Sequence, residues 1–320
     1  MNSVIRTYWP QYKWSNVFTM ISNMKQQVRG YSEPFRGKLV VITGATAGVG
    51  YYTVRKYAAM GARIIMINRN PEKSERVCRY ITEQYGTPIE YYIADLSVLA
   101  DVQRVGQYLL SLGKTIDVLI HNAGVHHKSR KETPEGLEVN FVIHYLAPLI
   151  ITRMLIPKYQ QDRTGRIIFV NSEAYRFAVW GLDVDDLQWK RRRYVGIKAY
   201  GAGKLAQILS MHILARELAP YNVTVAAMHP GMVRTESGKD NGRLYQWYKR
   251  NIIDALSDSP EVSAEALYYL GASPEAAHTN DVFFHLTIGE ELTPPARDLE
   301  AAETLWKRTN KLLHKRGITL

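Results

Sequence analysis

The sequence predicts an α/β fold in which helices cover both faces of a doubly wound parallel sheet. Three observations lead to this prediction. Seven short apolar runs alternate with helical patterns from Lys38 onward. These runs are continuously apolar, as expected of strands that are buried on both faces. A glycine-rich turn directly follows the first run, at the place where a βα unit would begin its helix.

The predicted elements follow one another along most of the chain. The strands are residues 38–43, 63–68, 89–94, 116–121, 166–171, 222–228 and 282–285. The helices are residues 49–60, 71–85, 98–112, 134–159, 200–218 and 263–270. Such an alternation favours one domain over residues 37–320, with ligands at the carboxyl ends of the strands.

Two segments lie outside this alternation. Residues 1–36 form an N-terminal extension, in which residues 14–28 have the spacing of an amphipathic helix. The apolar face of that helix would pack on the domain, across a homodimer, or peripherally on a membrane through residues 9–28. Residues 173–199 form a long insertion between a strand and a helix, where a substrate loop is expected. Its Tyr175, Phe177 and Trp180 favour an apolar substrate.

Composition narrows the classes of function. The net charge of +11 favours anionic ligands. No nucleic-acid-binding motif is present, so no nucleic acid partner is expected. The nine histidines are scattered, and no metal site is predicted. Cys78, the single cysteine, lies on an apolar helical stripe and is interpreted as a buried hydrophobic residue.

No apolar run reaches the length of a membrane span, and the first residues lack the features of a signal peptide. We expect a cytoplasmic location, with peripheral membrane association at most.

The glycine-rich turn has the pattern of a dinucleotide site. Gly44 would take up unusual backbone angles, Gly48 would let the backbone approach a pyrophosphate, and Gly50 would let helix and strand pack closely. Thr46 and Val49 lie between them. The helix that follows offers free N–H groups to the phosphates.

The end of the second strand indicates which dinucleotide binds. NAD enzymes usually carry a ribose-binding acid there, but this chain has Asn68 followed by Arg69. No carboxylate repels a 2′-phosphate at this place, and the Arg69 guanidinium can pair with one. The expected cofactor is therefore NADP, as NADPH or NADP+.

Several blocks in order make the chain resemble the short-chain dehydrogenase/reductase family, and specifically its retinol-dehydrogenase-like branch. The resemblance begins near Arg36 and implies a Rossmann-type fold. The blocks are residues 43–50, Asp95-Leu96, Asn122-Ala123-Gly124, Asn140, Ser172, Tyr200 with Lys204, His229-Pro230-Gly231 and residues 233–236.

The resemblance implies further contacts with the cofactor. It places Asp95 and Leu96 at the adenine ring and Asn122, Ala123 and Gly124 along the pocket. It adds Pro230, Gly231, Val233 and Thr235, with Thr235 near the nicotinamide amide. The chain departs from the family pattern at two positions, where His121 replaces an asparagine and Gly203 replaces a serine.

The expected chemistry is a hydride transfer between nicotinamide and a carbonyl or alcohol carbon. Tyr200 would be the general acid and base, because a carbonyl oxygen that receives a hydride needs a proton. Lys204 lies one helical turn later. An ammonium at ~4 Å would favour the phenolate by roughly 4 kcal/mol. Ser172 would hold the substrate oxygen. In the family, an asparagine such as Asn140 positions a water that links the lysine to solvent.

A second pair, Tyr194 and Lys198, has the same spacing. We prefer Tyr200 because Lys204 continues into an apolar helical stripe, whereas residues 195–197 begin a helix poorly.

The leading interpretation is an NADP-dependent oxidoreductase acting on CH–OH groups of a lipophilic small molecule. The alternative is a catalytically silent NADP-binding sensor or scaffold of the same fold. The complete set Asn140, Ser172, Tyr200 and Lys204 argues against that alternative.

Overall fold

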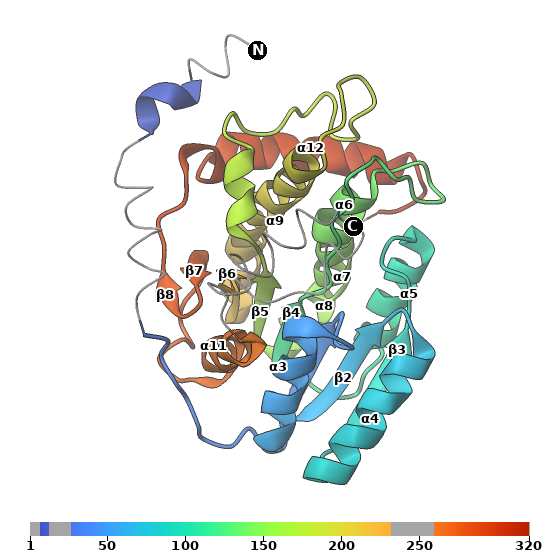
Figure 1. Ribbon diagram of the computed structural model, residues 1–320, viewed down its shortest axis with the longest axis vertical. Coiled ribbons are helices and arrows are strands. Elements are labelled where there is room, and N and C mark those ends of the chain that lie inside the picture. Colours follow the sequence, from blue (N-terminus) through green and yellow to red (C-terminus); the bar gives the residue numbers. More distant parts are fainter. Residues whose placement is uncertain (1–6, 13–26, 232–258, 320) are drawn as a thin grey trace, which may run out of the picture.

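One eight-stranded sheet forms the centre of the molecule (Figure 1). The computed structural model describes residues 7–12, 27–231 and 259–319. The sheet has the order β3-β2-β1-β4-β5-β6-β7-β8, and only the β7–β8 pair is antiparallel. The strands are β1 (Leu39–Thr43), β2 (Arg63–Asn68), β3 (Ile89–Ile93), β4 (Val118–His121), β5 (Gly165–Val170), β6 (Val223–His229), β7 (Val282–His285) and β8 (Ile288–Gly289). The prediction of a doubly wound parallel sheet is confirmed. The short hairpin strand β8 was not predicted.

The strand order reverses direction at β1. This strand pairs in parallel with β2 on one side and with β4 on the other. The crossover connections therefore leave in opposite directions, and the carboxyl ends of β1 and β4 open a crevice between them. Every described residue that the sequence predicted for cofactor binding belongs to a segment that follows one of the strands β1 to β6, or to helix α9 next to them.

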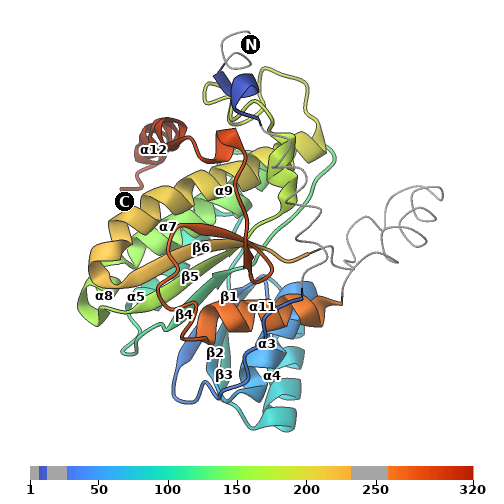
Figure 2. The ribbon, with the colours of Figure 1, turned by 90° about the vertical axis from the view of Figure 1, so that its left-hand side faces the viewer.

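Helices cover both faces of the sheet (Figure 2). Helices α3 (Gly48–Ala59), α4 (Pro71–Tyr85) and α11 (Pro260–Ala272) pack on one face, with Val54, Ile81 and Leu267 in their core. Helices α5 (Leu99–Leu110), α7 (Ala147–Met154), α9 (Gly196–Leu218) and α12 (Leu299–His314) cover the other face. Burial on both faces explains why the central strands are continuously apolar, whereas the edge strand β3 is partly exposed and contains Glu90.

The predicted long helix over 134–159 is not continuous. It begins at Val139 as α6 (Val139–Phe141), passes through a π-helical turn (η2, Val142–Leu146) into α7, and bends into α8 (Ile156–Asp162). Pro148 and Pro157 explain the irregularities, because proline cannot donate to the preceding turn. Within the described residues, no single helix is long and apolar enough to cross a membrane. One pair, Val139–Met154 with Ile156–Asp162, passes together but is bent by 46°.

Helix boundaries differ from the prediction at two other places. Helix α9 begins at Gly196, not at Tyr200, so that its first turn already contains Lys198. Helix α12 was not predicted, although Asp298 caps its N-terminus by accepting a hydrogen bond from Ala301 N–H at 2.8 Å. The described part also contains five other short elements: η1 (Trp9–Gln11), η3 (Glu173–Phe177), η4 (Ala219–Tyr221), η6 (Pro294–Ala296) and the bridge between Glu132 and Glu138.

The N-terminal extension contacts the domain wherever it is described. Residues 13–26, which hold most of the predicted amphipathic stripe, lie outside the described residues. After them, Tyr31 stacks on Tyr268 with ring centroids 6.0 Å apart, and the buried Phe35 packs edge-on against Tyr57. Residues 28–35 are therefore part of the folded domain.

Candidate functional site

The glycine-rich turn has the geometry that its sequence predicted. Gly44 and Gly48 have φ angles of +68° and +55°, which favour glycine. A Cβ at Gly50 would lie 2.4 Å from the Gly44 carbonyl oxygen, so this position excludes any side chain. A Cβ at Gly48 would meet nothing within 4 Å. The space over Gly48 and the tight packing under Gly50 fit a backbone that a pyrophosphate approaches closely.

The first turn of α3 leaves its N–H groups available. Ala47 at the N-cap offers no side-chain hydrogen bond, and the first turn contains no acidic residue. The helix dipole adds partial positive charge at this end. These features fit a bound phosphate, which would satisfy the free N–H groups.

Asn68 has a role that the sequence analysis did not predict. Its side chain is buried, and its Oδ1 accepts a hydrogen bond from Ala45 N–H at 2.7 Å. Its Nδ2 donates to the Ser74 hydroxyl at 3.1 Å. Asn68 therefore connects the glycine turn to the first turn of α4.

Arg69 and Asp95, which were predicted to bind the adenosine part of the cofactor, form an ion pair with each other. The Arg69 side chain is 74% exposed, and its Nη1 lies 3.7 Å from Asp95 Oδ2. Asp95 Oδ1 also accepts hydrogen bonds from the backbone N–H and hydroxyl of Ser97, at 2.9 and 2.7 Å. Leu96 is buried beside it. The guanidinium is thus exposed on the side away from the core, where it is available to an anion.

Asn122 joins the ends of β4 and β1. Its Nδ2 donates to the carbonyl oxygens of Thr43 and Gly44, at 3.0 and 2.8 Å. The Thr43 hydroxyl accepts hydrogen bonds from Asn122 N–H and Ala123 N–H, both at 3.0 Å. Thr43 was not among the predicted site residues. Its position directly before Gly44 was the signal available in the sequence.

Ser172 and Tyr200 lie together at the end of β5, where the serine hydroxyl is close enough to the phenol to influence its pKa. Asn171 holds the serine, since its Oδ1 accepts from Ser172 N–H at 2.8 Å, while its Nδ2 donates to Lys204 O and Gln207 Oε1. Asn171 is thus buried and structural, whereas Ser172, which the sequence indicated as the functional hydroxyl from its second place in the pair, is only partly buried. Burial raises the pKa of Tyr200 and the hydrogen bond with Ser172 lowers it, with a net increase.

Two glycines bring α9 close to its neighbours. A Cβ at Gly201 would lie 2.4 Å from the Ala174 carbonyl oxygen in η3. A Cβ at Gly203 would lie 3.3 Å from the Asn140 carbonyl oxygen. The serine expected before the lysine is therefore replaced by a residue that allows α9 to approach α6 closely. Close packing on both sides fixes the position of Tyr200.

Lys204 is buried, and its Nζ donates to the carbonyl oxygen of Val170 at 2.7 Å. Burial lowers the pKa of Lys204 to about 7. The ammonium lies 5.9 Å from the centroid of the Tyr200 ring. The expected lowering of the Tyr200 pKa by this ammonium is not seen, because Lys204 turns toward Val170 and the phenol is desolvated.

Asn140 lies in a buried polar cluster with the second tyrosine. Its Nδ2 donates to Glu138 Oε1 and to Tyr194 Oη, both at 2.8 Å. Glu138 is buried and also caps α6 through the N–H groups of Asn140 and Phe141. Lys198, in contrast, is exposed. The sequence analysis missed Glu138, whose only signal was its place before the first turn of a helix.

Two histidines complete the surroundings. His121, where the family has an asparagine, is buried, stacks on Phe169, and has its Nε2 3.0 Å from the Thr152 hydroxyl. Burial lowers its pKa to about 3, so it is neutral in the core. His144 lies edge-on to the Tyr200 ring at 5.0 Å, with Nε2 2.7 Å from Val125 O.

The remaining predicted cofactor contacts fall at the end of β6. Pro230 accepts a hydrogen bond from the Ser263 hydroxyl at 2.5 Å, and Gly231 has a φ of +77°. Val233 and Thr235 lie outside the described residues.

A buried charged cluster next to Ser172 was also missed. The Arg176 guanidinium forms ion pairs with both Glu173 and Glu290. Burial and the Glu290 charge raise the pKa of Glu173 to about 7, although the Arg176 charge acts in the opposite direction and lowers it. Glu173, His285 and Glu290 lie close enough to hold a cation. Arg176 already supplies positive charge there, which makes the cluster a link between η3 and the β7–β8 hairpin.

Comparisons with known proteins agree with this geometry. The short chain dehydrogenase family profile matches residues 38–183 and 189–245. Retinol dehydrogenase 13 of Homo sapiens is 30% identical over 302 residues, which cover 91% of this chain and 90% of that protein. Retinol dehydrogenase 14 of Mus musculus is 32% identical over 297 residues, which cover 89% and 88%.

A solved structure shares the fold. L-sorbose reductase from Gluconobacter frateurii, complexed with NADPH and L-sorbose, superposes with a TM-score of 0.62 at 22% identity, covering 80% of this chain and 96% of that one. The family profile itself matches well over half of this chain. A match of this extent, on a sheet with this strand order, means that the chain belongs to the short-chain dehydrogenase/reductase family of NAD(P)-dependent oxidoreductases.

Proposed function

We propose that the protein is an NADP(H)-dependent oxidoreductase that interconverts a carbonyl and an alcohol on a lipophilic small molecule. The observation that carries this proposal is the close approach of Ser172 and Tyr200 at the end of β5, with Lys204 buried one helical turn away. NADP is preferred because Arg69 is exposed at the end of β2 and no carboxylate follows that strand directly. The retinol dehydrogenases to which the chain is similar support a lipophilic substrate.

Tyr200 and Ser172 have different roles at the substrate oxygen. The bound nicotinamide supplies the hydride to the carbonyl carbon in reduction and accepts it in oxidation. Tyr200 gives its proton to the oxygen as negative charge develops there, and takes it back in the reverse direction. Its raised pKa keeps the phenol protonated near neutrality, which suits the donor role. The Ser172 hydroxyl holds the same oxygen by a hydrogen bond.

Lys204 and Asn140 serve the tyrosine. Lys204 has a pKa of about 7 and can exchange a proton near neutral pH. The Asn140 Oδ1 atom is buried and has no hydrogen-bond partner among the described residues. A buried acceptor of this kind favours an ordered water, which would connect Lys204 to solvent.

The test is a panel of aldehydes, ketones and alcohols that includes retinoids, steroids and short sugars, followed by NADPH absorbance. We expect turnover of apolar members, with NADPH preferred over NADH. Cofactor binding without turnover of any member would instead indicate the silent sensor.

The location is a separate proposal. We expect a cytoplasmic protein, with peripheral membrane contact at most, through the N-terminal segment. Trp9 is 68% exposed, while Tyr8 beside it is anchored by a hydrogen bond to Asp298 at 2.7 Å. Vesicle sedimentation of the full chain and of a chain lacking residues 1–26 tests this, because Phe35 and Tyr31 must stay to complete the core. Partition of the full chain into a detergent phase as an integral protein would contradict it.

A further inference from the structure

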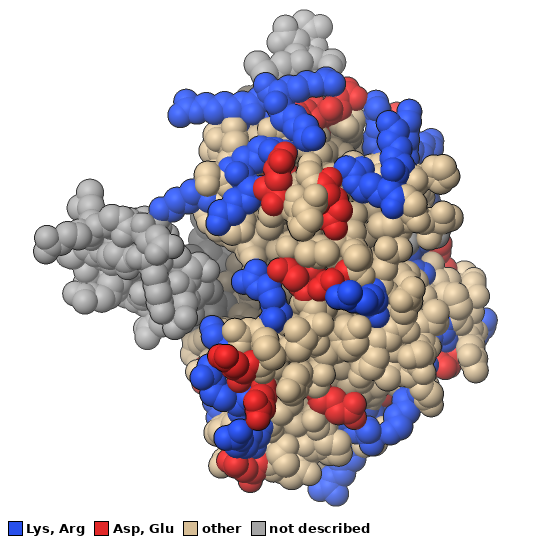
Figure 3. Space-filling view, turned by 90° about the vertical axis from the view of Figure 1, so that its right-hand side faces the viewer, with Lys and Arg blue, Asp and Glu red and all other residues tan. Residues whose placement is uncertain are grey.

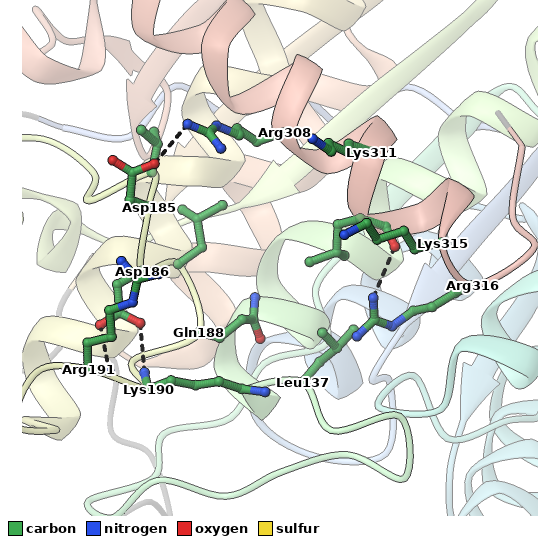
Figure 4. Close-up of a pocket in the computed structure, with 13 residues that line it drawn as sticks. Leu137, Asp185, Asp186, Gln188, Lys190, Arg191, Arg308, Lys311, Lys315 and Arg316 are labelled. Atoms are coloured by element: carbon green, nitrogen blue, oxygen red, sulfur yellow. Dashed lines mark hydrogen bonds and ion pairs between the residues drawn. The ribbon is translucent and has the colours of Figure 1, made fainter.

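A second hollow lies away from the dinucleotide crevice, between the substrate loop and α12 (Figure 4). Its volume is about 440 Å³, within the range of small-molecule sites. One wall is the loop segment 184–191, and the other is the last two turns of α12 and the residues that follow. Leu137, Leu187 and Leu312 provide apolar surface between the walls.

The hollow is strongly cationic. Six basic side chains line it: Lys190, Arg191, Arg308, Lys311, Lys315 and Arg316. Only two acidic residues, Asp185 and Asp186, are among the lining residues, so the net charge is +4. Figure 3 shows Lys and Arg side chains gathered on one face of the molecule, chiefly in its upper part. Arg308, Lys311 and Lys315 follow one another at i, i+3 and i+7, and so share one face of α12.

Both acidic residues are already engaged. Asp185 pairs with Arg308 at 2.8 Å. Asp186 is buried, and its carboxylate accepts hydrogen bonds from the backbone N–H groups of Lys190, Arg191 and Arg192, at 2.7, 3.2 and 3.3 Å. Within the described part of the chain, no ion pair within 4 Å engages Lys190, Arg191, Lys311 or Lys315.

The loop wall is built to hold its cations in place. Trp189 is buried with a φ of +54°, an uncommon conformation for a bulky residue. The Arg192 guanidinium stacks on its ring at 3.7 Å, and Asp186 holds the three N–H groups that follow. Backbone strain of this kind persists only where the surroundings enforce it. The backbone of Lys190 and Arg191 is thereby held on the wall of the hollow that faces α12.

Basic residues near a helix C-terminus can be explained by the dipole alone. That explanation does not cover Lys190 and Arg191, which come from another segment and repel the α12 cations. Bringing like charges together costs free energy unless an anion joins them. A phosphomonoester carries about −1.5 to −2 at neutral pH, so two or three such groups would match the net charge.

We infer that this hollow binds a phosphate-bearing anion with at least two phosphomonoester groups, either a soluble metabolite or a lipid headgroup. The ligand would bridge the substrate loop and α12. The loop wall is connected to the catalytic side through Gln188, whose Oε1 accepts from Glu138 N–H at 2.7 Å. This inference does not depend on the oxidoreductase activity.

The first measurement is calorimetric titration with inositol 1,4,5-trisphosphate, in excess NADP+ to occupy the dinucleotide crevice. We expect one site per chain, with affinity that falls as salt increases. The double variant Lys311→Glu/Lys315→Glu should weaken binding at least tenfold. The matched pair Lys114→Glu/Lys307→Glu makes the same change in net charge outside the hollow and should alter affinity less than twofold. If the α12 double variant does not fold, Lys190→Gln/Arg191→Gln tests the opposite wall.

The second measurement distinguishes the source of the phosphate. Phosphatidylcholine vesicles with and without phosphatidylinositol 4,5-bisphosphate are sedimented with the same variants. If Lys311→Glu/Lys315→Glu loses binding to the soluble trisphosphate or to the vesicles while Lys114→Glu/Lys307→Glu keeps it, the site is supported. The measurement in which binding is lost identifies the source of the phosphate groups. Absence of binding in both measurements, or an equal loss in the control pair, overturns the inference.

Discussion

The hydroxyl of Tyr194 accepts a hydrogen bond from the Asn140 amide at 2.8 Å and donates one to Glu138 at 3.0 Å. The second Tyr-x-x-x-Lys pair is therefore not a copy of the first. Its tyrosine supports the asparagine from the side of the substrate loop, and its Lys198 is exposed. Tyr200 instead contacts Ser172.

This difference predicts the behaviour of the two tyrosines. Tyr200→Phe should lower kcat by at least about 10³-fold, because the proton donor is lost, while NADPH affinity stays nearly intact. Tyr194→Phe should keep kcat within about tenfold, because it removes only hydrogen bonds that position Asn140. Steady-state kinetics and NADPH fluorescence titration measure both effects. A larger loss of kcat in Tyr194→Phe than in Tyr200→Phe would reverse our choice of pair.

Arg69 should determine the choice of cofactor. Arg69→Ala should weaken NADPH binding by about 10- to 100-fold, as expected for the loss of a charge-assisted hydrogen bond, with little change for NADH. The matched control is Arg79→Ala, which removes an exposed arginine on α4 whose ion-pair partner among the described residues is Glu75. Equal use of both cofactors by the wild type would contradict this prediction. Asn68→Asp is unsuitable as a second substitution beside Arg69→Ala. The buried Asn68 amide bonds to Ala45 N–H and to the Ser74 hydroxyl, so its replacement would also disturb the core.

His212 should make stability depend on pH. Burial lowers the pKa of His212, but the hydrogen bond and the charge of Asp281 raise it by more than burial lowers it. The net shift of the pKa is therefore upward. The two ring nitrogens face Asp281 Oδ1 at 2.6 Å and Ala296 O at 2.7 Å, so the imidazolium is satisfied on both sides. A raised pKa stabilises the fold below the ordinary value of 6.5, and this contribution is lost as the pH rises through the folded-state value.

The test is Asp281→Asn, which keeps the shape and the acceptor but removes the charge. Urea unfolding at pH 5.5 should show a loss of about 1 kcal/mol, and the loss should shrink by pH 9. A loss that is the same at both pH values would mean that His212 is neutral throughout.

Lys204 should contribute with the opposite sign. Its pKa falls from 10.5 to about 7 in the folded protein, so the unfolded chain binds more protons between these values. Stability from this group therefore rises with pH across that window, by up to about 1.4 kcal/mol per pH unit. The test compares the free energies of unfolding of Lys204→Met and the wild type, both without cofactor. The advantage of the variant over the wild type should be greatest at pH 7 and should shrink progressively toward pH 9. A constant difference would show that Lys204 keeps its ordinary pKa.

The sequence predicted the features that depend on local pattern. The seven parallel strands were predicted because each is a mainly apolar run, of which β3 with Glu90 is the least apolar. Ser172 was preferred to Asn171 because it holds the second place of the pair, and the buried Asn171 bonds to Lys204 O and Gln207 instead. Features that depend on contacts between distant residues were missed. Glu138 meets Tyr194 only because the substrate loop folds back, and Arg176 meets Glu290 across more than one hundred residues. Helix α12 was missed because its buried stripe of Ala302, Leu305, Thr309 and Leu313 is interrupted by cations.

The two edges of the sheet have unequal capacity for strand addition. At one edge, β8 has only two residues, too few to serve as a template for another chain. At the other edge, β3 has five residues, with Tyr91 and Ile93 more than one-third exposed. Glu90, the second residue of β3, carries a charge that opposes the approach of a second strand. Within the described residues, β3 is therefore the edge strand at which a second molecule could pair its own strand. The Glu90 carboxylate is the charge that opposes such pairing and the aggregation that would follow from it.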